Sequence, residues 1–282
     1  YSTIVPIEWR DTKINFIDTP GYLDFIGEAE SGLAAGDNAL IVVGAKEGVQ
    51  SGTQTAWEAA QSRKLPTIFF INKLDEEHAS FKTVIPFEVP IVENGEVVGS
   101  INILRDKAWY FKGEKANRDK ACDVPDDMKD EVAEYKNQIA EAIAMGDDEL
   151  MEKYFSGEEF SEAELTRGVR IGVRSGEIRP VFSGSAINMT GIERLMDLIV
   201  KYFPTYGENG TVTVTDIEKE EPVELQTTEN EKFTGLVFKT IVDPFVGRIS
   251  FIKVKSGTLS ADSNVYNPKK DKMEKIAQIY KG

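Results

Sequence analysis

Three short groups of polar and glycine residues follow apolar runs in this sequence, and each is suited to contacting a ligand. They are DTPG at residues 18–21, NKLD at residues 72–75 and SGSA at residues 183–186. Each group stands where a run of strand length ends. Open α/β sheets place their ligand sites at the carboxyl ends of their strands. We therefore treat the three groups as candidate parts of one site.

The NKLD group is suited to recognising a guanine base. The carboxylate of Asp75 can accept two parallel hydrogen bonds from N1 and the exocyclic amino group of guanine, which adenine does not supply. Asn72 can join neighbouring loops through its amide, and the aliphatic part of Lys73 can lie across the face of the base. Taken alone, four such residues also occur in ordinary loops and helix starts.

The other two groups each allow a functional and a purely structural interpretation. Backbone N–H groups at Ser185 and Ala186 can donate to the guanine O6, which the amino group of adenine would repel; the alternative is a capped loop before a helix. In DTPG, Asp18 ends the strand and Gly21 lets backbone approach a bound group. The alternative there is an ordinary turn after a strand.

Strand and helix patterns alternate along the parts of the chain that carry these groups. Apolar runs at residues 14–17, 39–43, 67–71 and 180–182 predict buried strands, and residues 51–64 and 192–199 have helical spacing. This alternation predicts an α/β fold with a parallel sheet, right-handed crossovers and its functional loops at one edge. DTPG and NKLD would then be neighbours.

The segment between NKLD and SGSA is far longer than the strand and helix needed to join them. Residues 89–111 alternate apolar and polar side chains around ENGE, which predicts a hairpin or meander. Residues 126–155 have the pattern of an amphipathic helix, and residues 157–178 predict a second helix. The acidic residues of these helices are most simply explained as a solvated face.

Composition sets outer limits on the function. With 282 residues, 41% of them hydrophobic, about two or three domains are expected. A net charge of −15 disfavours binding nucleic acid by charge neutralisation alone. The single cysteine, Cys122, excludes an internal disulfide and favours a reducing compartment, the cytoplasm. No run is apolar enough to cross a membrane, and His78, in a charged run, is expected at the surface without a metal.

The motifs DTPGYLDF, NKLD and SGSA, in that order, resemble those of the translational GTPases, and the chain is most similar to the elongation factor G family. Residues 237–268, VFKTIVDPFVGRISFIKVKSGTLSADSNVYNP, resemble the start of that family's second, β-barrel domain. The resemblance implies a P-loop GTPase-type parallel sheet, incomplete at its N-terminus, with an inserted α+β subdomain and part of a β-barrel domain. The expected divisions are 1–84 and 179–206 for the GTPase domain, 85–178 for the inserted subdomain, and 207–282 for the linker and partial barrel.

The resemblance also implies an activity, ligands and partners. The intact protein would bind GTP or GDP with magnesium, which Asp18 would reach through water, and would hydrolyse GTP on the ribosome. Its partners would be ribosomal RNA and the ribosomal stalk protein, the latter through the inserted subdomain, with no membrane contact. The residues that match the family's nucleotide-binding positions are Asp18, Gly21, Asn72, Lys73, Asp75, Ser185 and Ala186.

The sequence departs from the family at several places. The phosphate loop pattern G-x-x-x-x-G-K-[ST] is nowhere in the 282 residues, so this chain by itself is expected to bind GTP weakly and to be inactive. The helix after NKLD is shorter than in the family. Residues 207–282 hold too few strands to close a barrel.

Tyr22 stands where the family has a histidine that faces the attacking water. A phenol, with a reference pKa of about 10 against about 6.5 for imidazole, cannot become the cationic donor that histidine can. Tyrosine either impairs hydrolysis or is tolerated because the ribosome supplies the alignment. Two alternative functions stay open: a tetracycline-type ribosomal protection GTPase, which is built on the same domains, and, because of Tyr22, a GTP-dependent ribosome-binding factor with negligible hydrolysis.

Overall fold

The structure is a computed structural model that describes residues 2–76, 86–111, 120–217 and 219–280. The chain forms two compact units. The first unit contains Tyr1–Ile7, Asn15–Asp37 and Pro204–Gly282. The second contains Glu8–Ile14 and Asn38–Phe203. The shortened helix expected after NKLD, His78 and the expected division at residues 84 and 85 lie outside the described residues.

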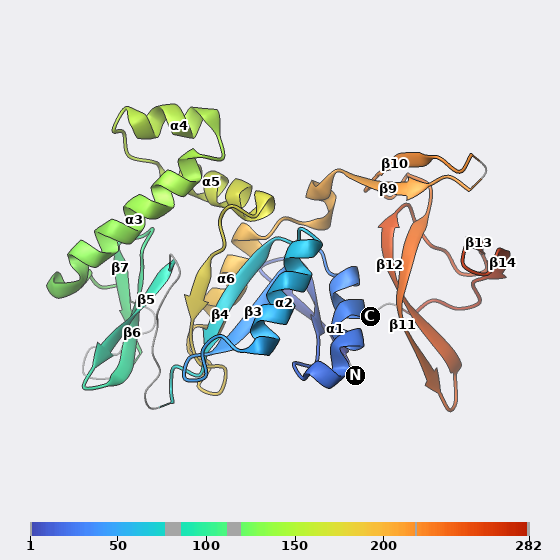
Figure 1. Cartoon of the computed structure of the whole chain (residues 1–282), viewed down its shortest axis with the longest axis horizontal. Coiled ribbons are helices and arrows are strands. Elements are labelled where there is room, and N and C mark those ends of the chain that lie inside the picture. Colours follow the sequence, from blue (N-terminus) through green and yellow to red (C-terminus); the bar gives the residue numbers. More distant parts are fainter. Residues whose placement is uncertain (1, 77–85, 112–119, 218, 281–282) are drawn as a thin grey trace. The chain divides into compact units, whose positions relative to one another are not determined.

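The centre of the second unit is a parallel sheet of three strands in the order β3-β4-β8 (Figure 1). The strands are β3 (Ala39–Gly44), β4 (Thr67–Asn72) and β8 (Val181–Ser183). Leu40 pairs with Ile68, and Phe70 pairs with Phe182. These runs are almost wholly apolar because a parallel sheet is covered on both faces. The predicted α/β fold with a parallel sheet is confirmed.

Helices cover both faces of this sheet. In Figure 1, α2 (Ser51–Ser62) lies in front of β3 and β4, and α6 (Ile192–Tyr202) lies behind them. The ring of Trp57 in α2 packs on Phe69 of β4, with 5.5 Å between ring centroids. The predicted apolar face of α6 is buried through Leu195, Met196 and Ile199.

The segment between β4 and β8 contains an antiparallel meander, as the alternating pattern predicts. Its strands are β5 (Glu88–Glu93), β6 (Glu96–Asn102) and β7 (Lys107–Tyr110). Asn94 and Gly95, both at positive φ (53° and 82°), form the turn between β5 and β6. An Asn-Gly pair with two positive φ angles is the preferred type I′ hairpin turn, which explains why the sequence signal was reliable.

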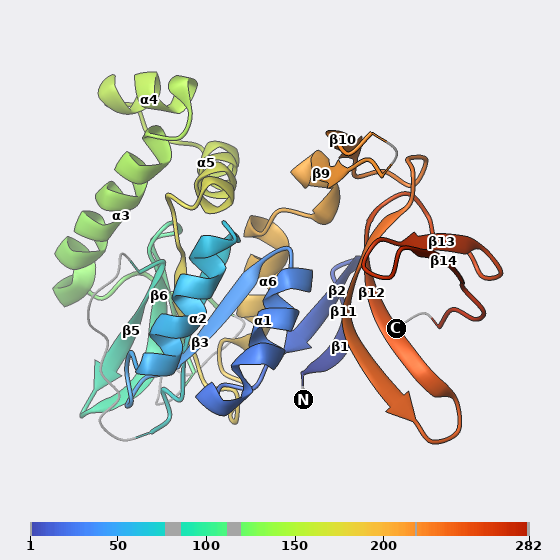
Figure 2. The ribbon, with the colours of Figure 1, turned by 45° about the vertical axis from the view of Figure 1, so that its right-hand side comes forward.

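Three helices follow the meander and group together in Figures 1 and 2: α3 (Lys129–Ala144), α4 (Asp148–Phe155) and α5 (Glu162–Ser175), with the short η2 (Asp126–Met128) before α3. The expectation of one helix across residues 126–155 was wrong. The chain turns at Gly146, and Asp147 caps a new helix by accepting the N–H of Leu150 at 3.1 Å. An aspartate N-cap stabilises a helix start, so it separates α4 from α3.

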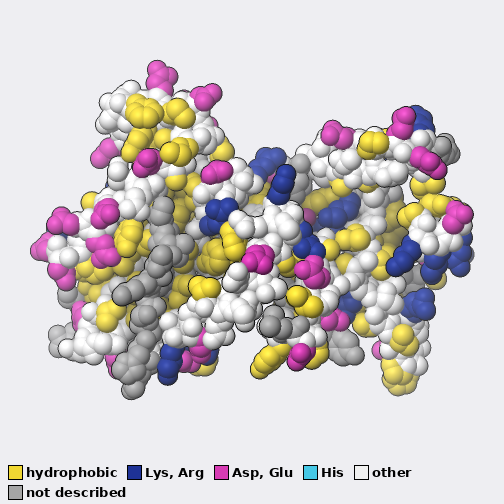
Figure 3. Space-filling view, viewed as in Figure 1, with side chains coloured by type: hydrophobic (Ala, Val, Ile, Leu, Met, Phe, Trp, Pro, Cys, Tyr) yellow, Lys and Arg dark blue, Asp and Glu magenta, His cyan; other side chains and the backbone are white. Residues whose placement is uncertain are grey.

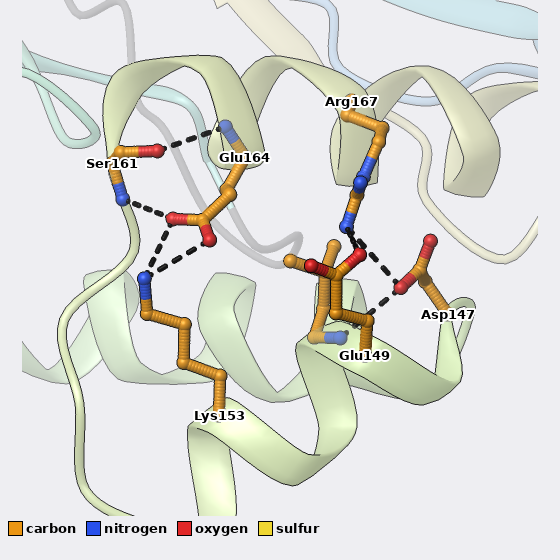
Figure 4. A network of polar contacts seen from close by, with 7 residues as sticks. Asp147, Glu149, Lys153, Ser161, Glu164 and Arg167 are labelled. Atoms are coloured by element: carbon orange, nitrogen blue, oxygen red, sulfur yellow. Dashed lines mark hydrogen bonds and ion pairs between the residues drawn. The ribbon is translucent and has the colours of Figure 1, made fainter.

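Ion pairs join α4 to α5, as Figure 4 shows. Lys153 Nζ lies 2.8 Å from Glu164 Oε2, and Arg167 lies 2.8 Å from Glu149 Oε2. Glu164 also accepts the N–H of Ser161 at 2.7 Å in the capping box that begins α5. Lys153 and Ser161 together lower the pKa of Glu164 to about 2.

The strand that leads into DTPG forms a two-stranded hairpin with the strand before it. These are β1 (Thr3–Trp9), which the sequence analysis did not predict, and β2 (Thr12–Asp18). Arg10 and Asp11, at φ 48° and 57°, form a tight turn between them. We expected β2 in the parallel sheet, but among the described strands its partner is β1, because a two-residue turn costs little loop-closure entropy. The proximity of DTPG to NKLD stays a prediction, since the motifs belong to different units.

In the first unit, η1 (Leu23–Phe25) and α1 (Ile26–Ala35) follow DTPG. Helix α1 lies against β11 in Figures 1 and 2, and Lys253 pairs with Asp37 just beyond the helix. The rest of the first unit contains η3 (Tyr206–Asn209) and, among its described residues, three two-stranded antiparallel sheets. Their strands are β9 (Thr211–Thr215) with β10 (Pro222–Gln226), β11 (Thr234–Asp243) with β12 (Gly247–Ser256), and β13 (Asn264–Asn267) with β14 (Lys272–Lys275).

Candidate functional site

NKLD and SGSA lie side by side at the carboxyl edge of the parallel sheet. They follow the neighbouring strands β4 and β8, and the ladder continues past the strands: Gly184 N–H donates to Ile71 O at 2.9 Å, and Leu74 N–H donates to Gly184 O at 3.1 Å. The side-chain Oδ1 of Asn72 accepts the N–H of Ala186 at 2.9 Å. Asn72 thus ties the two loops together through its amide.

The SGSA loop is a tight turn with little freedom. Ser185 and Thr190 exchange two backbone hydrogen bonds, of 2.9 and 3.0 Å, and Ser185 is 2% exposed. A side chain at Gly184 would place its Cβ 2.3 Å from Thr190 O, so only glycine fits. The Ser185 N–H is therefore used inside the loop. The Ala186 N–H instead donates to Asn72 of the NKLD motif. A guanine O6 would accept this N–H together with Asn72 or in its place.

Lys73 adopts a left-handed backbone conformation, φ 64°, between two glutamates. Its Nζ lies 2.9 Å from Glu47 Oε1, in the loop after β3, and 3.3 Å from Glu76 Oε1. The hydrogen bond to Glu47 raises the pKa of Lys73 and lowers that of Glu47. Asp75 is exposed and has no hydrogen bond to another described residue, so its carboxylate is open to a ligand.

The predicted residues of DTPG belong to the first unit. Asp18 is exposed at the end of β2, and Tyr22 is 78% exposed while its backbone oxygen accepts the N–H of Phe25 at 2.9 Å. A Cβ at Gly21 would meet nothing within 4 Å, so packing within the protein does not explain this glycine. Helix α1 packs closely against the motif: a Cβ added at Gly32 would lie 2.6 Å from Thr19 Cγ2.

One feature next to SGSA was missed in the sequence. Glu88, at the start of β5, is 2% exposed and forms an ion pair with Arg194 of α6. Burial raises the pKa of Glu88, whereas Arg194 and the Ser183 N–H lower it. The two residues are far apart in the sequence, and no motif or periodicity links them. The only signal in the sequence was Glu88 itself, a charged residue between the apolar residues Phe87 and Val89.

The described part of the chain contains no group of three or more His, Cys, Asp or Glu side chains placed to hold a metal ion. In the same residues, no helix has the length and apolar character needed to cross a membrane.

Comparisons with known proteins cover nearly the whole chain. The family described as Elongation factor Tu GTP binding domain matches residues 1–205, and Elongation factor G domain 2 matches residues 232–281. The chain is 33% identical to elongation factor G of Mycoplasma pneumoniae, over 99% of this chain and 42% of the relative. It is 35% identical to elongation factor G of Ureaplasma parvum, over 97% of this chain and 41% of the relative.

A crystal structure of a protein from Thermus thermophilus has the same fold, with a TM-score of 0.73 and 28% identity, over 93% of this chain and 38% of that one. The chain thus spans 42% and 41% of the length of the two elongation factors it matches. Its matches run through the GTP-binding domain and into the second domain. The chain belongs to the translational GTPase family and is an elongation factor G-like protein.

Proposed function

We propose that the full-length protein is a translation factor that binds guanine nucleotides, acts on the ribosome and hydrolyses GTP to GDP and phosphate. The observation that carries this proposal is the hydrogen bond between Asn72 and Ala186, which brings two candidate base-binding loops to one sheet edge. The family match over residues 1–205 supports the same function.

Each base-site residue has a role suited to its surroundings. Asp75, with its exposed carboxylate, would accept the two N–H groups of guanine, and Ala186 would donate to O6. Lys73 would lay its aliphatic part across the base while Glu47 holds its ammonium. Ser185 builds the loop through its two bonds to Thr190.

The phosphate side of the proposed site rests on DTPG. An exposed carboxylate at the end of β2 fits a residue that reaches a nucleotide-bound magnesium through water, and we assign that role to Asp18. Open space around Gly21 fits close approach of a phosphate. The 282 residues contain no phosphate-loop motif, so we propose that this segment alone does not hydrolyse GTP.

Tyr22 favours a second candidate function, a GTP-dependent ribosome-binding factor with negligible hydrolysis. Its phenol is 78% exposed and stands where the family's histidine faces the attacking water. A neutral O–H stabilises developing charge less well than a cationic donor does. The two candidates differ in turnover and not in nucleotide binding.

For partners, we propose ribosomal RNA and the ribosomal stalk protein, in the cytoplasm. Residues 85–178 would be the inserted subdomain that meets the stalk protein, with 1–84 and 179–206 as the GTPase domain and 207–282 as linker and barrel. Figure 3 shows acidic side chains over α3 and α4 beside apolar ones. Met145 and Phe155, which are 69% and 80% exposed, offer the apolar contacts.

Ribosome-stimulated GTP hydrolysis by the full-length protein tests the proposal. We expect phosphate release from GTP, and not from ATP, to rise when ribosomes are added. GTP binding to the ribosome complex without phosphate release would support the binding factor instead. A full-length protein that does not distinguish GTP from ATP in binding would contradict both.

A further inference from the structure

The start of β5 contacts the elements on both sides of the SGSA loop. Glu88, the first residue of β5, is 2% exposed. Its carboxylate forms an ion pair with Nε of Arg194, in the first turn of α6. The preceding residue, Phe87, donates its N–H to Val181 O of β8 at 3.2 Å. These two neighbouring residues therefore contact the strand before the loop and the helix after it.

Arg194 is fixed from two sides. Its guanidinium lies over the ring of Trp109 in β7, 4.4 Å from the ring centroid, while its Nε faces Glu88. Close by, the ring of Phe87 contacts Phe182, with 5.9 Å between ring centroids. Because the Glu88 carboxylate is buried, its charge-assisted contact with Arg194 is stronger than one at the surface. Two residues of the meander thus hold the first turn of α6: Trp109 through its aromatic face and Glu88 through its carboxylate.

The SGSA loop and the start of α6 are packed too closely to adjust when one end of the loop moves. Gly191, the N-cap of α6, has φ 76°, and a Cβ there would lie 2.8 Å from Ser183 O. A Cβ at Gly184 would lie closer still to its neighbour, 2.3 Å from Thr190 O. Because the loop is closed on itself at these points, a movement of Ser183 or of the first turn of α6 moves Ala186 with it.

We propose that Glu88 is a positioning residue for guanine recognition: by fixing Arg194 and with it the first turn of α6, it holds the N–H of Ala186 where the O6 of guanine would meet it. This inference rests on the proposed function, because it concerns the same base site. Glu88 touches no nucleotide. The meander, as a consequence, is part of the machinery that selects the base.

The test compares nucleotide affinities of variants of the full-length protein. Glu88→Gln keeps the shape of the side chain but removes the charge that faces Arg194. The double variant Glu88→Leu with Arg194→Met replaces the pair by apolar groups of similar size, a change that buried ion pairs often tolerate. Glu93→Gln is the matched control, since Glu93 is exposed at the other end of β5.

Three ligands separate the contacts: GDP, 6-thio-GDP, which differs only at the O6 position, and IDP, which lacks the amino group facing Asp75. In the double variant, we expect GDP affinity to fall about tenfold, the scale of one hydrogen bond, while 6-thio-GDP affinity changes little. The preference for GDP over IDP should stay as in the wild type. Glu88→Gln should show the same loss to a smaller degree, and Glu93→Gln should show none.

An equal loss for all three nucleotides, or a folded variant that keeps the wild-type preference for GDP over 6-thio-GDP, would overturn the proposal. Melting temperatures identify the folded variants. Should the double variant not fold, Glu88→Gln alone decides between these outcomes. Failure of the proposed function looks different: the wild-type protein would then bind ADP as tightly as GDP.

Discussion

The side-chain oxygen of Asn72 accepts the backbone N–H of Ala186 at 2.9 Å, which joins two loops 114 positions apart in the sequence. This bond lies beyond the last paired residues of β4 and β8, at the edge where the proposed base site is located. It sets the spacing of the loops that carry Asp75 and the SGSA turn. Recognition of the base should therefore depend on this one amide.

Replacing Asn72 by alanine removes the tie and should weaken guanine nucleotide binding by the full-length protein about tenfold, the scale of one hydrogen bond. Asn72→Asp is the matched variant, because it keeps an oxygen that can accept the Ala186 N–H. Isothermal titration with GDP measures both. An alanine variant with wild-type affinity would show that the tie is not needed for the site.

Asp75→Asn should move the base preference of the full-length protein from guanine toward xanthine. An amide can donate to the xanthine O2, where a carboxylate would repel it. Competition between GDP and xanthosine diphosphate measures the shift, and Glu93→Gln, at an exposed residue at the end of β5, serves as the control. An unchanged preference would remove Asp75 from the base site.

Tyr22→His should raise ribosome-stimulated GTP hydrolysis by the full-length protein and leave nucleotide affinity nearly unchanged. The side chain would face the attacking water and make no ground-state contact with GTP. The gain should be about tenfold to a thousandfold, the scale of one transition-state donor. Single-turnover hydrolysis with saturating ribosomes measures it.

Tyr22→Phe is the control for this prediction, because it keeps the ring and deletes only the hydroxyl. The expected order of rates is histidine above tyrosine, and tyrosine at or above phenylalanine. A histidine variant slower than the wild type would identify Tyr22 as an adapted catalytic or structural group. The impaired-hydrolysis interpretation would then be wrong.

The network of Figure 4 predicts a pH-dependent stability. Lys153 and Ser161 lower the pKa of Glu164 from 4.5 to about 2, so the folded state favours the ionised carboxylate more than the unfolded chain does. This stabilisation is complete above the unfolded pKa of 4.5 and is lost as the pH falls through about 2. Glu164→Gln should therefore melt earlier than the wild type at neutral pH.

The difference in melting temperature between Glu164→Gln and the wild type should shrink as the pH is lowered below the unfolded pKa of 4.5. Thermal unfolding followed by circular dichroism over this range measures it. Glu158→Gln, an exposed glutamate before α5, is the comparison variant. A difference that stays constant with pH would mean that the charge of Glu164 does not contribute.

Local signals in the sequence predicted much of this fold. The Asn94–Gly95 pair predicted its hairpin because few other residue pairs readily adopt two positive φ angles in succession. The apolar runs identified β3, β4 and β8, since strands buried on both faces leave no room for polar side chains. The helix break at Gly146 was missed because the apolar spacing continues across it, although the capping residue Asp147 was visible.

The candidate site was predictable only in part, for a physical reason. Motifs identified Asn72 and Asp75 because their side-chain chemistry is specific. The contacts that place them are long-range: Glu88 contacts Arg194 through the tertiary fold, and no pattern within either segment encodes that contact. The pairing of β2 with β1 likewise depended on the conformation of Arg10 and Asp11, a pair that lacks the glycine of the preferred two-residue hairpin turns.

The pairing of β4 with β8 has a consequence for how the chain assembles during synthesis. The elements β3, α2 and β4 are made first, and the second edge of β4 can pair with β8 only after the meander and the helices α3 to α5 have been made. Chains emerge at about 5–20 residues per second, so this edge is exposed for seconds. The Phe87 N–H donates to Val181 O, so a meander that has already folded provides a hydrogen-bond partner for β8. The edge of the sheet that carries the proposed base-binding loops is therefore completed last.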